Sequence, residues 1–219
     1  ENEPKAGEII DFYNQYSVRQ KQFGVNERHK SILDKAIKHG LQPSHNVLEI
    51  GCGIGTQTRL LLQYLKKGTL YGCDFSPENI RIAKEELGYY SNLYLDVQDA
   101  TDFLIEKTFD VIIMPDVIEH IPMELHERMF KNMEKMLQDD GFVFIHIPNP
   151  YHTDYCKKNG IQMQIIDQAV HLENIICSIK NTGLYISKME IYSVWLNECE
   201  YEYLILKKKS ILNNFTSTE

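Results

Sequence analysis

The sequence predicts a single α/β domain built around one mostly parallel sheet, and three observations support this. Strand-like and helix-like segments alternate along most of the chain, which is the order of a parallel sheet with helical crossovers. A glycine-rich turn, residues 51–55, follows the first strand-like segment. The chain has 219 residues, of which 43% are hydrophobic and 25% charged, the length and mixture of one globular domain. We therefore treat residues 1–219 as one domain.

Five apolar segments are expected to form parallel strands, at 45–50, 69–75, 92–97, 109–114 and 142–147. The fourth of them (FDVIIM) is apolar at nearly every position, as is usual for a strand covered on both faces. Two later segments, 185–195 and 201–207, are rich in Tyr, Ile and Val and lie too close together for a helix between them. They are expected to form an antiparallel hairpin at the sheet edge, which brings the strand count to seven.

Helices are expected between these strands and before them. The clearest start is at residues 76–78 (SPE), a capping residue followed by proline and then by an acid in the first turn. Another helix begins at Pro122, with Leu and Met at helical spacing. The same periodicity predicts helices over 7–22, 27–39 and 172–179.

Charge and cysteine usage exclude several kinds of partner. The chain has 23 Lys and Arg against 31 Asp and Glu, a net charge of −8, so a nucleic-acid partner is not expected. The five cysteines show no C-x-x-C spacing, which favours reduced thiols over disulfides or zinc. No stretch of about 18 apolar residues predicts a membrane span. We expect a cytoplasmic protein, monomer or homodimer, with no metal in its site.

The turn at residues 51–55 (GCGIG) is the strongest local signal. Glycines let the backbone approach a ligand closely, and in open α/β sheets ligands bind beyond the carboxyl ends of the strands. A dinucleotide site would need a third glycine at Thr56, and the carboxylate of Glu49 would repel a pyrophosphate. Glu49 suits a positively charged ligand instead. S-adenosylmethionine carries a sulfonium and an ammonium group.

Two further acids follow successive strands. Asp74 ends the second expected strand, 23 residues after Gly51, where an acid can accept both ribose hydroxyls. Asp99 follows the third strand and could accept from an adenine amino group, with Phe75 and Ala100 beside the ring. Together with the glycine turn, these acids favour S-adenosylmethionine as the cofactor.

The segments VLEIGCGIGTQT, YGCDFSPENIRIAKE, VQDAT and FDVIIMPDVIEHIP resemble the successive motifs of class I S-adenosylmethionine-dependent methyltransferases. The E-H-I-P motif after the fourth strand resembles the small-molecule branch of that family. The resemblance covers residues 27–148 and implies a Rossmann-like three-layer sandwich, whose seven-stranded sheet has an antiparallel last strand. It implies S-adenosylmethionine as cofactor and S-adenosylhomocysteine as product. The cofactor-binding residues that it implies are Glu49, Gly51, Cys52, Gly53, Gly55, Asp74, Phe75, Asp99, Ala100 and Asp116.

Two segments are expected to contact the substrate. The first is an N-terminal helical cap, residues 1–40, in which Arg19 could pair with the cofactor carboxylate. The second, residues 148–171, is long for a plain connection and is interpreted as a substrate-facing lid. The candidate substrate residues of the two segments are Tyr13, Tyr16, Arg19, Asn149, Tyr151, His152 and His171.

His120 is the candidate catalytic residue, because it follows the fourth strand beside the expected methyl position. A hydroxyl nucleophile must lose a proton, and an imidazole is a suitable base near neutral pH. Three roles stay open for His120: general base, substrate contact without proton transfer, or cap of the helix at Pro122. His152 and His171 are alternative bases, whereas His146 lies inside a strand and is expected to face the core.

These features favour a methyltransferase that acts on a hydroxyl group, less readily an amine, of a small polar metabolite such as a sugar or glycan precursor. Two alternatives stay open. The chain could be a cofactor-binding partner subunit without activity, or its acceptor could be a protein or a lipidic quinone. A dinucleotide-dependent oxidoreductase is disfavoured by Glu49 and Thr56.

Overall fold

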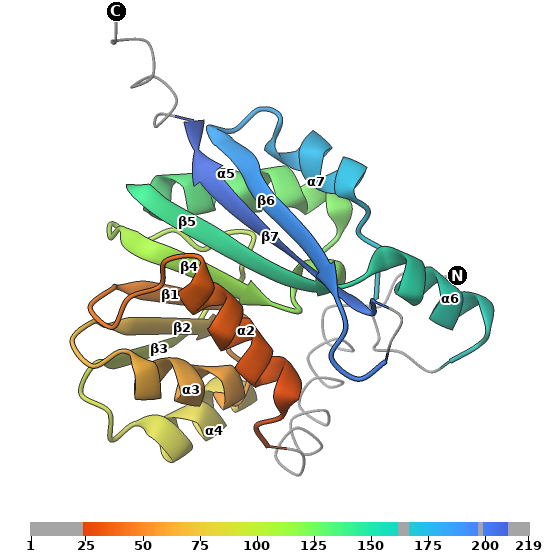
Figure 1. Cartoon of the computed structure of the whole chain (residues 1–219). Coiled ribbons are helices and arrows are strands. Elements are labelled where there is room, and N and C mark those ends of the chain that lie inside the picture. Colours follow the sequence, from red (N-terminus) through yellow and green to blue (C-terminus); the bar gives the residue numbers. More distant parts are fainter. Residues whose placement is uncertain (1–23, 162–166, 197–198, 210–219) are drawn as a thin grey trace, which may run out of the picture.

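A computed structural model describes residues 24–161, 167–196 and 199–209 of the chain (Figure 1). Its centre is a seven-stranded sheet in the order β3-β2-β1-β4-β5-β7-β6. The strands are β1 (Val47–Ile50), β2 (Leu70–Asp74), β3 (Leu93–Val97), β4 (Phe109–Pro115), β5 (Leu137–Pro148), β6 (Leu184–Tyr192) and β7 (Tyr201–Lys208). Strands β1 to β5 pair in parallel, and β7 runs antiparallel to both β5 and β6. The predicted sheet is confirmed, with the last strand inserted between β5 and β6.

Helices cover both faces of the sheet, which gives three layers (Figure 1). On one face lie α2 (Glu27–Lys38), α3 (Thr56–Tyr64) and α4 (Pro77–Leu87), and on the other lie α5 (His126–Met136) and α7 (Leu172–Ile179). Two short 3-10 turns, η1 (Ile118–His120) and η2 (Met123–Leu125), follow β4, and α6 (Pro150–Lys158) follows β5. The predicted helix over 7–22 lies outside the described residues.

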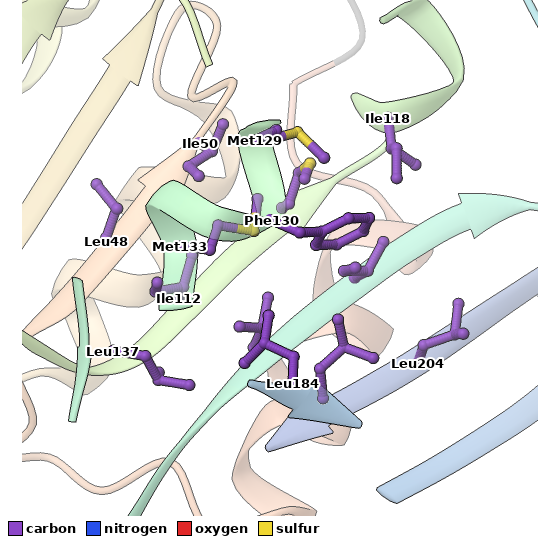
Figure 2. Packing of buried hydrophobic residues seen from close by; sticks show 14 of the residues in the cluster. Leu48, Ile50, Ile112, Ile118, Met129, Phe130, Met133, Leu137, Leu184 and Leu204 are labelled. Carbon is purple, nitrogen blue, oxygen red and sulfur yellow. The ribbon is translucent and has the colours of Figure 1, made fainter. Parts of the chain in front are cut away.

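The core is built by alternation along the buried strands. Leu48 faces the layer of α5 and α7, whereas its neighbour Val47 faces α2 and α3. Figure 2 shows Met129, Phe130 and Met133 of α5 against Ile112 and other residues of the sheet. All of these side chains are fully buried, and they fix the position of β4, whose carboxyl end carries the site.

Two expectations from the sequence need correction. Strand β5 begins at Leu137 and not at residue 142, because Leu137 pairs with Phe109 of β4 and does not extend α5. Segment 148–171, expected as one long loop, contains the nine-residue helix α6. Asn149 caps this helix and Pro150 occupies its first turn, a start signal that was present in the sequence.

Candidate active site

A cavity of about 920 Å³ opens at the carboxyl ends of the parallel strands. Its walls come from the ends of β1 to β4, from α2 and from the turn between β6 and β7. Most of the sequence-predicted site residues lie together in this wall, whereas Gly55 lies behind it at the N-terminus of α3. Those in the wall are Glu49, Gly51, Cys52, Gly53, Asp74, Phe75, Asp99, Ala100, Asp116 and His120.

The glycine turn brings the backbone against the β4 end. Gly51 has a φ of +74°, and a Cβ atom there would lie 2.2 Å from Cγ2 of Val117. Only glycine combines this conformation with this contact. The N–H of Gly53 donates to Oδ2 of Asp74 at 2.9 Å, so the turn and the β2 end are tied together.

Asp74 is held by several donors. Besides Gly53, the backbone N–H of Ser76 (2.9 Å) and the side-chain amide of Asn79 (3.1 Å) donate to its Oδ1. Burial raises the pKa of Asp74, and these hydrogen bonds oppose the rise. A carboxylate has about four acceptor sites, so Asp74 can still accept from a ligand hydroxyl. Asp99 is held in a similar way, by the backbone N–H and hydroxyl of Thr101.

Glu49 is fully buried beside the same turn. The hydroxyl of Thr58 donates to its Oε2 at 2.7 Å, while Oε1 has no hydrogen-bond partner among the described residues. Burial raises the pKa of Glu49 to about 8. Gln57 also lines the cavity. Its side-chain nitrogen and oxygen are buried too, and neither has a hydrogen-bond partner in the part of the chain described. Buried polar atoms without partners are rare, and these fit a ligand that carries an ammonium and a carboxylate group.

Asp116 joins the cavity to a buried polar network. Its φ of +53° is unusual for a residue other than glycine, and it directs the carboxylate toward Arg28 and His146. Nδ1 of His146 lies 2.6 Å from Oδ1 of Asp116, and Nε2 lies 2.6 Å from the Tyr192 hydroxyl, to which Ser31 donates. Burial acts to raise the pKa of Asp116, but the charge of Arg28 and the contact with His146 hold it well below its usual range.

Because Asp116 is ionised, its carboxylate accepts a hydrogen bond from Nδ1 of His146. His146 is therefore buried, as the sequence predicted, and it belongs to the wall behind the site. His29 lies beside Arg28, and burial together with the Arg28 charge lowers the pKa of His29 to about 4. His29 is neutral at pH 7.

His120 lies on η1 with its side chain 12% exposed. Its Nδ1 is 3.3 Å from Oδ1 of Asp167, and its Nε2 is 3.8 Å from Oε1 of Glu119. Gln168 fixes the surrounding backbone, since its N–H donates to the Glu119 carbonyl and its side-chain amide to the Ile121 carbonyl. Burial, and then the Asp116 charge, raise the pKa of Glu119 well above its usual value. The carboxylate of Asp167, beside Nδ1, can stabilise a protonated His120.

Four of the predicted substrate residues do not line the cavity. Asn149 accepts from the Tyr151 N–H as the cap of α6, and Tyr151 is 73% exposed. His152 contacts Cys156 one helical turn away, and His171 pairs with Asp154. Their roles in binding stay predictions. Tyr13, Tyr16 and Arg19 lie outside the described residues.

Several cavity residues were not found from the sequence. Arg28 and His29 come from α2, Trp195 comes from the turn between β6 and β7, and Tyr201 is the first residue of β7. Gln57 lies two residues after the glycine turn, so its position could have been inferred from the motif. The other four reach the site through tertiary packing, and no local pattern marks them.

A sheet of this order, with a glycine turn after β1 and acids at the ends of β1 to β4, defines the class I methyltransferase fold. Residues 47–141 match the family model described as a methyltransferase domain. The predicted fold class is confirmed. The match to a methyltransferase domain supports S-adenosylmethionine, the cofactor predicted from the sequence.

Two curated relatives show how widely the acceptors of similar chains vary. Phosphoethanolamine N-methyltransferase 1 of Zea mays is 29% identical over 190 residues, covering 85% of this chain and 33% of the relative. A tRNA N(3)-methylcytidine methyltransferase of Schizosaccharomyces pombe is 31% identical over 116 residues, covering 50% of this chain and 44% of the relative. The chain thus spans less than half the length of these curated relatives.

A solved structure shows the same fold over nearly the whole chain. The magnesium protoporphyrin IX methyltransferase of Synechocystis PCC 6803 with bound SAH has a TM-score of 0.68 and 19% identity, covering 91% of this chain and 97% of that one. Within the described residues, no group of three or more His, Cys, Asp or Glu side chains is placed to hold a metal ion. None of the helices in that part of the chain has the length and apolar character needed to cross a bilayer.

Proposed function

We propose that the protein is an S-adenosylmethionine-dependent methyltransferase that methylates a hydroxyl group of a small polar acceptor. The observation that carries this proposal is the position of His120. It lies in the wall of the same cavity as the glycine turn, with one ring nitrogen beside Asp167. The cavity therefore combines cofactor-binding groups with a candidate proton acceptor.

The cofactor is assigned to the β1, β2 and β3 ends. Asp74 would accept from the ribose hydroxyls, with Phe75, Asp99 and Ala100 around the adenine, and Glu49 would pair with the ammonium group. When bound, S-adenosylmethionine supplies an electrophilic methyl group. The remaining work of the protein is to orient the acceptor, to exclude water and to remove one proton.

His120 is assigned as the base for that proton. Asp167 beside Nδ1 holds the ring and its tautomer, which directs Nε2 as the basic nitrogen. The negative charge of Asp167 stabilises the imidazolium that forms.

The charges of the residues that line the cavity near Asp116 support an uncharged acceptor. Arg28 is the one Lys or Arg side chain among the described residues lining the cavity, and Asp116 neutralises it. A hydroxyl-bearing metabolite such as a sugar or glycan precursor therefore fits better than a phosphate or a nucleic acid. The small-molecule branch and a cytoplasmic location remain part of this proposal.

The test uses purified protein, methyl-labelled S-adenosylmethionine and an extract of the source cells. We expect label in the small-molecule fraction, and a fall of about 100-fold or more in His120→Ala, the range of a lost general base. Asp167→Asn should lower kcat at least tenfold with the KM for S-adenosylmethionine unchanged. His45→Ala is the matched control, because His45 precedes β1 at the opposite end of the sheet.

Four other outcomes would contradict the proposal. Label in protein or nucleic acid would exclude a small acceptor, and label in a lipid fraction would favour the quinone. Label on a small amine would exclude the hydroxyl. Binding of S-adenosylhomocysteine without any methyl transfer would favour the partner subunit without activity.

A further inference from the structure

The turn between β6 and β7 and the start of β7 each contribute one aromatic residue to the cavity. Trp195 is the single tryptophan of the chain, is 53% exposed and lines the cavity together with Tyr201. In the sheet order, β7 and β6 lie on the opposite side of β1 and β4 from β2 and β3. The two aromatic residues therefore lie away from the strands assigned to the adenosine group.

A buried carboxylate holds this turn in place. Oε1 of Glu200 accepts from three consecutive backbone N–H groups, those of Val194 (2.9 Å), Leu196 (3.0 Å) and Trp195. Glu200 is 3% exposed, and its own carbonyl accepts from the Asn149 N–H at 2.8 Å. Burial acts to raise the pKa of Glu200, but these backbone hydrogen bonds outweigh burial and lower the pKa to about 2. The carboxylate is therefore charged at every pH at which the protein would be assayed.

Tyr201 is fixed from behind by the polar network. Its ring stacks on the buried ring of His146, with centroids 5.0 Å apart and planes 29° apart. Since His146 is hydrogen-bonded to Asp116, the Tyr201 ring lies next to the carboxyl end of β4, which leads into η1 and His120. A buried charge and a half-exposed tryptophan thus occur together at a turn that faces the cavity. Core packing alone does not require either of them there.

We propose that Trp195 and Tyr201 form the acceptor-binding wall, and that it stacks against the flat face of an uncharged ring bearing the hydroxyl group to be methylated. Aromatic side chains offer large, rigid contact surfaces, and the charges of Arg28 and Asp116 beside them cancel. A pyranose and a phenol share this chemistry. Glu200 is a positioning residue that acts through Trp195. This inference rests on the proposed function, because it concerns the acceptor of the same reaction.

The single tryptophan gives a direct readout of binding. Protein saturated with S-adenosylhomocysteine is titrated with phenol, methyl glucopyranoside, choline and phosphoethanolamine, while the tryptophan emission is followed. We expect a saturable change with at least one of the two ring compounds, at concentrations at least tenfold below those needed for the charged compounds. Tighter binding of a charged compound, or no saturable change with either ring, would overturn the proposal.

Variants then separate the wall from the rest of the site, with binding followed by calorimetry. Trp195→Ala and Glu200→Ala should weaken ring binding at least tenfold and change S-adenosylhomocysteine affinity less than twofold. Trp195→Phe keeps a flat ring, and Glu200→Gln keeps an acceptor oxygen, so both should recover most of the loss. Tyr89→Ala removes an exposed aromatic residue outside the cavity and should change nothing. Trp195→Ala leaves the Glu200 hydrogen bonds in place, so it tests the wall even where Glu200→Ala does not fold.

The two proposals fail differently. Ring compounds that bind through Trp195 without ever receiving label would contradict the methyltransferase activity and support the wall. Methyl transfer to a ring hydroxyl with unchanged acceptor KM in Trp195→Ala would contradict the wall and support the activity. Equal losses of ring and S-adenosylhomocysteine affinity in Trp195→Ala would also contradict the wall.

Discussion

Replacing Glu49 by glutamine tests how the cofactor end of the cavity works. Gln has nearly the same shape, and its carbonyl oxygen can accept the 2.7 Å hydrogen bond from Thr58. The change therefore keeps packing and removes only the ability to become negatively charged. Two opposite effects are expected, one on the stability of the protein alone and one on its affinity for the cofactor.

The stability effect follows from the pKa of Glu49. The folded value of about 8 lies above the ordinary 4.5, so between these values the folded state holds a proton that the unfolded state has released. The contribution of Glu49 to the free energy of unfolding is fully present below pH 4.5 and decreases as the pH rises toward 8. Between pH 4 and pH 7 the free energy of unfolding decreases by about 3 kcal/mol because of this group. The Glu49→Gln variant cannot ionise at this position, so its free energy of unfolding does not decrease in this way. At pH 7 its Tm should exceed that of the wild type by about 6–12 °C.

The binding effect has the opposite sign. Pairing with an ammonium group requires Glu49 to ionise, so wild-type affinity for S-adenosylhomocysteine should rise with pH up to about 8. A hydrogen bond between charged groups contributes about 1.5–3 kcal/mol, so Glu49→Gln should bind about 10- to 150-fold more weakly at pH 8. Its affinity should also lose the pH dependence below pH 8.

Calorimetric titrations and thermal unfolding between pH 5 and about 9 measure both effects. Glu106→Gln, an exposed glutamate with no ion pair among the described residues, is the matched control. The reasoning is refuted if Glu49→Gln binds S-adenosylhomocysteine as tightly as the wild type at pH 8. It is also refuted if the variant unfolds at a lower temperature at pH 7.

Three further predictions follow from the same site. Arg28→Ala leaves the Asp116 carboxylate buried without its guanidinium partner, so chemical denaturation should show a loss of about 2 kcal/mol at pH 7, less than the 3–5 kcal/mol of fully buried pairs. Because the pKa of Asp116 is depressed, this difference should shrink as the pH falls below the ordinary aspartate value. Gly51→Ala places a Cβ against Val117 in a left-handed conformation, so S-adenosylhomocysteine binding should be lost, and adding Val117→Ala should restore only part of it. Methyl transfer should be unchanged by a chelator of divalent metals, and inhibition that added Mg²⁺ or Zn²⁺ reverses would contradict the described site.

The part of the cavity wall formed by the ends of β1, β2 and β3 was predictable because its signals are local. A glycine turn and acids at strand ends each occupy fixed places in a strand-to-helix connection, so Gly51, Asp74 and Asp99 could be placed in one cavity wall from their spacing. His120 belongs to the same group, since it follows β4 by a few residues.

The part of the cavity wall that contains Arg28 and Trp195 was not predictable in the same way. Arg28 reaches Asp116 across 88 residues of chain, and Trp195 reaches the cavity because β7 inserts between β5 and β6. The aromatic and polar residues of 148–171 suggested a lid, but Asn149 and Tyr151 are used by α6 or face solvent. The composition of this segment indicated a polar surface, but tertiary packing places other residues in the cavity wall.

The most direct test of the central claim is the chemical position of the transferred methyl group. The protein is incubated with S-adenosylmethionine carrying an isotopically labelled methyl group and with the extract, and the labelled product is examined by NMR. The account predicts a methyl signal on oxygen, attached to a ring compound and absent from the His120→Ala reaction. A methyl signal on nitrogen, or one of equal intensity in His120→Ala, would contradict it.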